Sequence, residues 1–216
     1  MRIRRKKWAE KELQEAKFYI DKPEVNKGKW GEYFSNKAPI HIELGCGKGL
    51  FIATLAQKNQ NINYIDVDMI EAMLGLSKRN IEEAYNFEEP QNLALIRANV
   101  ELINNVFADE DKVDRIYINF CNPWPKAKHN KRRLTHTRQL ENYKKFLKSN
   151  GEIYFKTDDD ELFEASLEYF KESGFDIEKI TYDLHKEPIF EENIETEHEK
   201  MFSAEGIKIK ALIARV

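Results

Sequence analysis

A polar turn with two prolines, Asn122 to Pro125, separates a strand-like apolar run from a strongly basic segment. Two prolines so close together are incompatible with both a helix and a central strand, so the turn should be stiff, exposed and located at a strand end. In α/β proteins, the loops at strand ends carry many of the binding and catalytic residues. The amide of Asn122 and the ring of Trp124 are therefore the first candidates for chemistry.

The segment after this turn contains cations but no acids. Its cations are Lys126, Lys128, Lys131, Arg132 and Arg133. Their spacing does not fit one helix face, and they lack acidic partners nearby in sequence, so phosphate contact is favoured over an ordinary solvated charge run. The formal net charge of −3 hides a polarised distribution, because residues 1–11 are also basic whereas residues 187–205 hold seven glutamates against Lys200.

A second candidate site is the glycine-rich stretch Gly45, Gly47 and Gly49, which follows the acidic residue Glu43. Glycines allow the backbone to approach a ligand closely and leave amide groups directed at it from a helix start. The spacing is G-x-G-x-G rather than the G-x-G-x-x-G of dinucleotide sites. A carboxylate at position 43 would repel a pyrophosphate but attract an ammonium group, which favours an amino-acid-like cofactor, S-adenosylmethionine.

Polar residues follow the next two expected strands. Asp68 stands at the end of the second strand, about 20 residues after the glycine loop, where Rossmann-type geometry places a carboxylate against ribose hydroxyls. Asp66 competes for this role because it lies on the same face of the strand, two residues earlier. Asp68, at the end of the strand, reaches a ligand better. Asn99, after the third strand, is either an amide contact for adenine or an ordinary turn residue.

These candidates need a scaffold of alternating strands and helices. The expected strands are residues 40–44, 62–67, 93–96, 113–120, 153–156, 177–184 and 207–216, and the expected helices are residues 8–19, 50–58, 70–81 and 134–147. A further helix, capped by residues 157–160, is expected to carry Leu162 to Phe170 and to end at Gly174. Such alternation predicts an α/β, doubly wound, mostly parallel seven-stranded sheet with helices on both faces. No good helix separates the last two strands, which suggests an antiparallel pair and makes the last strand antiparallel. A ligand site is expected outside the carboxyl ends of the strands.

The composition favours one cytoplasmic domain over residues 1–216, with a basic N-terminal segment at about residues 1–20 whose path the sequence leaves open. Apolar runs are too short to cross a bilayer, so no membrane partner is expected. Neither Cys46 nor Cys121 has another cysteine or a histidine at metal-ligand spacing, which argues against a metal site and a disulfide. Monomer and homodimer remain equally open.

The chain resembles the bacterial tRNA (guanine-N7)-methyltransferase family over nearly its whole length. The motifs that carry the resemblance are ELGCGKG (43–49), NFCNPWPK (119–126), HNKRRL (129–134), FKTD (155–158) and NIETEHE (193–199). The resemblance implies a Rossmann-like class I fold that uses S-adenosylmethionine and a substrate guanine in the variable loop of tRNA.

The resemblance also implies roles for individual residues. Cofactor contacts are implied for Glu43, Asp68, Asn99 and Asn122, in addition to the glycine loop. Substrate contacts are implied for Lys126, Asp158, Thr196, Glu197, His198 and Glu199, and RNA contacts for Lys128, His129, Asn130, Lys131, Arg132 and Arg133. Trp124 is expected either to stack on an extruded base or to cap the sheet.

Two positions depart from the family pattern, which usually has Asp where this chain has Asn99 and Asn122. The family assigns a catalytic role to the second position. Guanine N7 holds an in-plane lone pair and loses no proton on methylation, so the reaction needs placement and exclusion of water rather than a general base. An asparagine can position the base through both its carbonyl and its NH2 group, so we expect activity to be retained.

Two alternative functions stay open at this stage. Asn122-Pro123-Trp124 is similar to the Asn-Pro-Pro-aromatic turn of amino-group methyltransferases, which would make the chain an adenine N6-type nucleic-acid methyltransferase. Against this, Trp124 stands where that motif has its second proline. The other alternative is a non-catalytic tRNA-binding protein that retains the fold.

Overall fold

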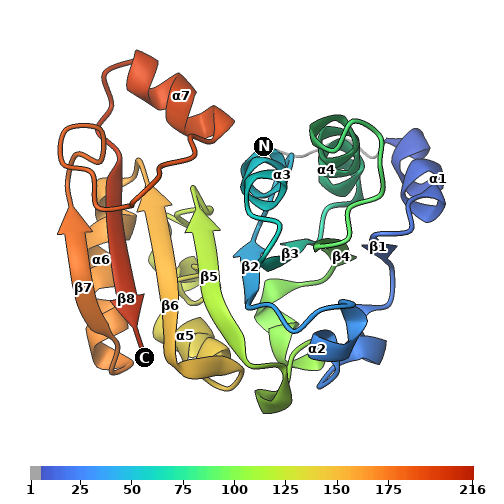
Figure 1. Cartoon of the computed structure of the whole chain (residues 1–216). Coiled ribbons are helices and arrows are strands. Elements are labelled where there is room, and N and C mark those ends of the chain that lie inside the picture. The colour runs from blue at the N-terminus through green and yellow to red at the C-terminus, as the bar shows by residue number, and fades with distance from the viewer. Residues whose placement is uncertain (1–5) are drawn as a thin grey trace. The chain divides into compact units, whose positions relative to one another are not determined.

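The computed structural model describes residues 6–216 (Figure 1). The chain divides into two compact units, Met1–Lys112 and Val113–Val216. The first three arginines of the basic N-terminal segment, Arg2, Arg4 and Arg5, lie outside the described residues. Within residues 6–216, no helix has the length and apolar character needed to cross a bilayer.

The first unit contains a parallel sheet with the strand order β1-β4-β3-β2. Its strands are β1 (Tyr19–Ile20), β2 (Ile40–Leu44), β3 (Asn63–Asp68) and β4 (Leu93–Arg97). Its helices are α1 (Lys7–Glu15), α2 (Trp30–Tyr33), α3 (Leu50–Lys58) and α4 (Glu71–Ala84), with the 3-10 turns η1 (Pro23–Asn26), η2 (Val100–Asn105) and η3 (Asp109–Asp111). The strands and helices alternate as the sequence predicts for an α/β fold.

The central strands of this unit are more deeply buried than their sequences suggest. The alternation of β2 indicates one apolar and one polar face, yet all five of its residues are buried, including His41 and Glu43. The ring of His41 packs edge-on against Tyr64 of β3, with centroids 5.6 Å apart. A strand in a parallel sheet is commonly covered on both faces, so polar residues on it are buried and must serve packing or a site.

The N-terminal segment is a packed helix followed by a short strand. The helix predicted for residues 8–19 ends at Glu15, because Tyr19 and Ile20 pair with β4 instead and add an eighth strand to the seven expected. A Cβ added at Gly75 of α4 would lie 2.7 Å from the Cβ of Ala9, so glycine allows α1 to approach α4 closely. From Lys7 onward, the basic segment therefore has a defined path.

The second unit contains a mixed sheet with the strand order β5-β6-β8-β7. Its strands are β5 (Val113–Asn119), β6 (Leu147–Thr157), β7 (Asp176–Thr181) and β8 (Lys210–Arg215), and its helices are η4 (Ala127–Arg132), α5 (Thr137–Lys144), α6 (Asp160–Glu172) and α7 (Glu197–Ala204). β5 and β6 are parallel, whereas β8 is antiparallel to both β6 and β7, which confirms the predicted pairing of the last two strands. α7 lies beyond the end of the sheet where β5 and β6 finish (Figure 1).

Two element boundaries in this unit differ from the sequence-based expectation. The helix predicted for residues 134–147 is limited to Thr137–Lys144, because Leu147 pairs with Val113 and starts β6. Pairing with β5 thus overrides the helical pattern at its end. The region between the last two strands also contains a helix, α7, capped by Thr196, whose side chain accepts a hydrogen bond from the Glu199 amide.

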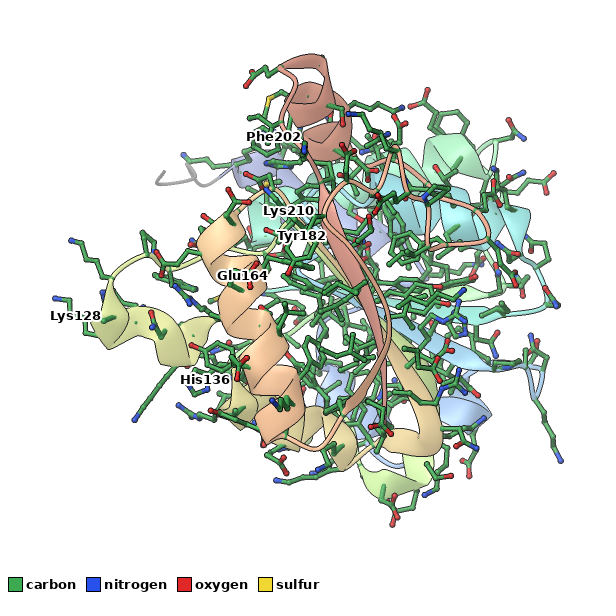
Figure 2. All side chains as sticks on the ribbon, turned by 90° about the vertical axis from the view of Figure 1, so that its left-hand side faces the viewer. Lys128, His136, Glu164, Tyr182, Phe202 and Lys210 are labelled. Atoms are coloured by element: carbon green, nitrogen blue, oxygen red, sulfur yellow. The ribbon has the colours of Figure 1, made fainter. Side chains whose placement is uncertain are left out.

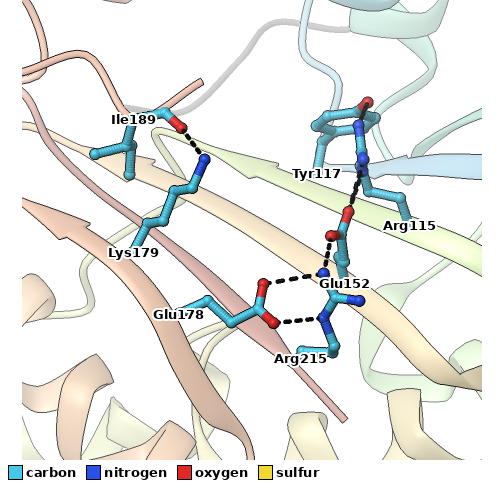
Figure 3. A network of polar contacts seen from close by, with 7 residues as sticks. All are labelled: Arg115, Tyr117, Glu152, Glu178, Lys179, Ile189 and Arg215. Atoms are coloured by element: carbon cyan, nitrogen blue, oxygen red, sulfur yellow. Dashed lines mark hydrogen bonds and ion pairs between the residues drawn. The ribbon is translucent and has the colours of Figure 1, made fainter. Parts of the chain in front are cut away.

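A ladder of alternating charges crosses the four strands of the second unit (Figure 3). Arg115 on β5 donates from Nη2 to Glu152 on β6 at 2.6 Å, and the other oxygen of Glu152 accepts from Arg215 on β8 at 2.7 Å. Arg215 also pairs through Nε with Glu178 on β7 at 2.7 Å. Arg115, Glu152 and Arg215 are opposite one another in the strand register, and such opposite charges favour this pairing over a slipped one.

We predict that Glu152→Gln lowers the free energy of unfolding by about 1–3 kcal/mol, because it leaves two partly buried guanidinium groups without their shared carboxylate. Glu178→Gln is the matched control, with an expected loss of about 0–1 kcal/mol, since the Glu178 side chain is 39% exposed. Urea denaturation of both variants measures the difference. Equal losses would show that Glu152 has no special role in holding the sheet.

Candidate functional site

The glycine loop of the first unit joins the end of β2 to the start of α3 with three left-handed residues. Gly45, Gly47 and Gly49 have φ angles of 83°, 56° and 70°, a conformation that other residues adopt at a cost. A Cβ at Gly49 would stand 2.0 Å from the Ser77 hydroxyl oxygen, so α3 packs on α4 only with glycine there. At Gly47, the nearest atom to an added Cβ is the Met73 methyl carbon at 3.9 Å. Position 47 is therefore glycine for its backbone conformation and not for lack of space.

Asp68 connects this loop to the loop that follows β3. Its Oδ2 accepts a hydrogen bond from the Gly47 amide at 3.1 Å, and its Oδ1 accepts one from the Ile70 amide at 2.8 Å. Burial raises the pKa of Asp68, while these backbone hydrogen bonds act in the opposite direction. A carboxylate has about four lone-pair sites, so Asp68 can still accept from a ligand hydroxyl.

The competing candidate, Asp66, lies in the interior. It is fully buried, and its Oδ2 accepts from the hydroxyl of Ser77 on α4 at 2.8 Å. Burial raises the pKa of Asp66 to about 7, although hydrogen bonds from Ser77 and Cys46 partly offset this effect. The geometry therefore favours Asp68 over Asp66 as the residue that meets a ligand.

Asn99 is the N-cap of η2. Its Oδ1 accepts from the Glu101 amide at 3.0 Å, so any ligand contact must use its NH2 group or the second lone pair of the oxygen. An aspartate could form the same cap, but it could not donate a hydrogen bond. Glu43, the remaining cofactor candidate in the first unit, lies on β2 with 2% of its surface exposed.

In the second unit, the predicted stiff turn follows β5. Asn122 is exposed, and its Oδ1 accepts a hydrogen bond from the Trp124 amide at 3.0 Å. Phe120 and Trp124, on either side of Asn122, have φ angles of 50° and 45°, which are uncommon for aromatic residues. The turn is thus held by its own side chain, with one strained residue, Phe120, just before it and another, Trp124, within it.

The ring of Trp124 packs against the basic segment that follows it. Its centroid lies 5.6 Å from that of His129, and the Arg132 guanidinium carbon lies 5.1 Å from it. Lys126, Lys128, Lys131 and Arg132 are exposed, whereas His129 and Asn130 are half-buried. Figure 2 shows Lys128 at the outer end of this segment. Four of the five predicted phosphate contacts are therefore available to a polyanion.

The fifth predicted phosphate contact, Arg133, lies inside the protein. Only 1% of Arg133 is exposed. Its Nε donates to the carbonyl oxygen of Pro123 at 2.7 Å, and its Nη2 donates to Glu161 at 2.7 Å. The guanidinium is occupied within the protein and has no surface for RNA.

The motif at residues 196–199 divides into buried and exposed positions. Glu199 is fully buried, and its carboxylate binds Lys156 at 2.7 Å and Asn193 at 2.5 Å, so this predicted substrate contact lies inside the protein. Thr196 caps α7 with its hydroxyl oxygen. Glu197 and His198 are exposed, and the His198 ring lies nearly parallel to that of Phe120 with centroids 6.1 Å apart. α7 thus packs beside the Asn122 turn.

Asp158 follows β6 in the same unit and is half-buried. Its backbone carbonyl accepts a hydrogen bond from Lys210 at 2.8 Å. The structure thus gives Asp158 a fixed backbone position at the end of β6.

Both cysteines are free thiols. Burial raises the pKa of Cys121 to about 12 and that of Cys46 well above its ordinary value. Neutral thiols are poor nucleophiles and metal ligands, so neither residue is a candidate for chemistry.

The comparisons with known proteins identify the family of the chain and its fold. A family model described as "Putative methyltransferase" matches residues 37–212. A tRNA (guanine-N(7)-)-methyltransferase of Clostridium botulinum (strain Eklund 17B / Type B) is 61% identical over 99% of this chain and 98% of its own length, and one of Clostridium beijerinckii is 60% identical over the same shares. The chain belongs to the tRNA (guanine-N7)-methyltransferase family. The resemblance read from the motifs is confirmed.

Solved structures similar to this family member share its fold. An antibiotic-related methyltransferase aligns with a TM-score of 0.60 at 22% identity, covering 91% of this chain and 94% of its own. The 16S rRNA methyltransferase KamB aligns with a TM-score of 0.62 at 12% identity, covering 87% and 92%. These matches confirm the predicted class I methyltransferase fold.

The raised pKa of Asp66 leads to a prediction about stability. Between about pH 4 and about pH 7, the folded state retains a proton on Asp66 that the unfolded state has lost, so this residue makes stability fall as pH rises through that window. Asp66→Asn, which can still accept from Ser77, should remove this pH dependence of the free energy of unfolding. Its slope is at most about 1.4 kcal/mol per pH unit. Free energies of unfolding measured across the window test it, with Asp176→Asn at an exposed position as the control. A stability difference between wild type and Asp66→Asn that stays constant with pH would contradict the prediction.

Proposed function

We propose that the protein transfers the methyl group of S-adenosylmethionine to N7 of a guanine in the variable loop of tRNA. The observation that carries the proposal is the exposed Asn122 turn followed directly by four exposed cations, in a chain 61% identical to a tRNA (guanine-N(7)-)-methyltransferase. A stiff turn that presents an amide beside phosphate-binding cations suits a base within an RNA strand. The reaction would take place in the cytoplasm, where bacterial tRNA is found.

The polar groups of the first unit fit the cofactor. The buried carboxylate of Glu43 would hold the ammonium group, and Asp68 would accept from ribose hydroxyls through its remaining lone pairs. Asn99 would contact the adenine through its NH2 group, since its oxygen caps η2. The left-handed backbone at Gly45, Gly47 and Gly49 supports this site. When bound, S-adenosylmethionine supplies an electrophilic methyl group on a positively charged sulfur.

Asn122 serves the reaction by placement. The lone pair of guanine N7 is available at neutral pH, so no side chain has to remove a proton. The Oδ1 atom of Asn122 is engaged with the Trp124 amide, which orients the side chain and leaves its NH2 group to donate to guanine O6. In this proposal, the asparagine retains the turn that an aspartate would form and adds a donor beside the reacting nitrogen.

The remaining substrate residues have complementary roles. Asp158 and Glu197 can accept from the N1 and N2 hydrogens of guanine. Lys126, which is exposed, would contact the substrate, and His198 supports Phe120 beside the turn. Lys128, Lys131 and Arg132 would bind RNA phosphates. His129 and Asn130, which are half-buried, shape the segment that presents them.

We predict that incubation with labelled S-adenosylmethionine and bulk tRNA, followed by digestion to nucleosides, yields label in 7-methylguanosine. Cleavage of the RNA chain at the modified base should then map the label to the variable loop. Label in methyladenosine would instead support the amino-group methyltransferase alternative. Bound tRNA without any label would support the non-catalytic alternative.

We also predict that Asn122→Ala lowers kcat by about 10-fold to 100-fold, because it removes both the hydrogen bond to the Trp124 amide and the NH2 donor. Asn122→Asp retains the hydrogen bond with the Trp124 amide, so its kcat should fall less than that of Asn122→Ala. Asn61→Ala, which removes an exposed amide from the first unit, is the control with unchanged kcat. Wild-type kcat in Asn122→Ala would remove Asn122 from the mechanism.

A further inference from the structure

Arg133 belongs to a basic segment but differs from its neighbours in burial. Lys131 and Arg132 are exposed, whereas 1% of Arg133 is exposed. A buried guanidinium is costly unless each of its charges and donors has a partner. The question is therefore what Arg133 does inside the protein.

Arg133 connects two parts of the second unit. Its Nε donates to the carbonyl oxygen of Pro123, at the centre of the turn, and its Nη2 donates to Glu161 in the first turn of α6, both at 2.7 Å. Its own backbone is also fixed, because its amide donates to the Asn130 carbonyl and its carbonyl accepts from the His136 amide. The side chain thus ties the turn to an ordered helix.

The turn that Arg133 contacts needs such support. Left-handed angles at Phe120 and Trp124 persist only when the surroundings impose them. On the side of Phe120, the backbone amide donates to the Lys156 carbonyl at 2.9 Å and the ring packs against His198. On the side of Trp124, the backbone is held by the Asn122 side chain and by the Arg133 contact with Pro123, while the Trp124 ring packs against His129 and Arg132.

We propose that Arg133 is a positioning residue that holds the Pro123 carbonyl and thereby sets the orientation of the Asn122 side chain. This inference rests on the proposed function, in which Asn122 places the guanine. The planar guanidinium suits this task because its donors address two acceptors in different directions, one on the turn and one on α6. A lysine is a single point of charge and cannot reproduce both contacts.

The proposal separates Arg133 from Arg132, its neighbour with the same charge. Arg132 acts on RNA phosphates, so its removal weakens binding and reduces the salt dependence. Arg133 acts through the turn, so its removal affects the rate of methyl transfer without changing the number of phosphates neutralised. The slope of log affinity against log salt therefore distinguishes the two roles.

The test compares Arg133→Gln, Arg133→Lys and Arg132→Gln, with Lys171→Gln at an exposed position of α6 as the control. We expect Arg133→Gln to lower kcat by about 10-fold to 100-fold with an unchanged salt slope. Arg133→Lys, which can still donate to Pro123, should recover part of the loss. Arg132→Gln should flatten the salt slope by about one. Lys171→Gln should change neither quantity.

Hydrogen exchange supplies a readout that needs neither cofactor nor tRNA. The Trp124 amide, which donates to Asn122, should exchange faster in Arg133→Gln and, to a smaller extent, in Arg133→Lys. If wild type forms no 7-methylguanosine, the proposed function fails, while the exchange result still tests the link between Arg133 and the turn.

Three results would overturn the inference. The first is a salt slope reduced by about one in Arg133→Gln with kcat unchanged, which would make Arg133 a phosphate contact. The second is wild-type exchange of the Trp124 amide in a folded Arg133 variant. If Arg133→Gln does not fold, the third result is that a folded Arg133→Lys variant has wild-type kcat and wild-type exchange of the Trp124 amide.

Discussion

A buried ion pair between Lys156 and Glu199 fixes the C-terminal region of the second unit to its sheet. The side chains are 3% and 0% exposed, and their charged atoms are 2.7 Å apart. Charges buried so completely are tolerated only when hydrogen bonds within the protein replace those lost to water. Here Lys156 also donates to Asn193 and to the Ile194 carbonyl, and Asn193 donates to the second oxygen of Glu199. The result is a closed polar cluster that attaches the segment before α7 to β6.

This cluster determines what the rest of the C-terminal region can do. With Glu199 anchored, α7 directs His198 and Phe202 against the ring of Phe120, the first strained residue after β5. The anchor therefore acts on the Asn122 turn from one side, through packing, while Arg133 acts on it from the other, through hydrogen bonds. The Glu199 carboxylate, which belongs to a predicted substrate motif, thus also supports the structure from within the protein.

Local sequence patterns were sufficient for much of the fold and for the backbone of the glycine loop. The left-handed glycines could be predicted because a tight loop between a strand and a helix requires particular residues at particular positions. The burial of Arg133 could not, because its charge is the same as that of Arg132 and its partner Glu161 lies 28 residues further along the chain. The same limit applies to the end of α5, where pairing between Val113 and Leu147 decides the boundary. One local signal for α7 was available, since Thr196 and Glu199 have the spacing of a helix capping box.

The uneven charge of the second unit has a consequence for how a polyanion arrives. Four exposed cations follow the turn, while residues 187–205 contribute six exposed glutamates once the buried Glu199 is set aside. Opposite fields on one compact body exert a torque on an approaching nucleic acid, so the encounter is oriented before any contact forms. A nucleic acid that approaches with its phosphates toward the glutamate-rich segment is repelled. Association rates should therefore depend on ionic strength even where the final contacts are few.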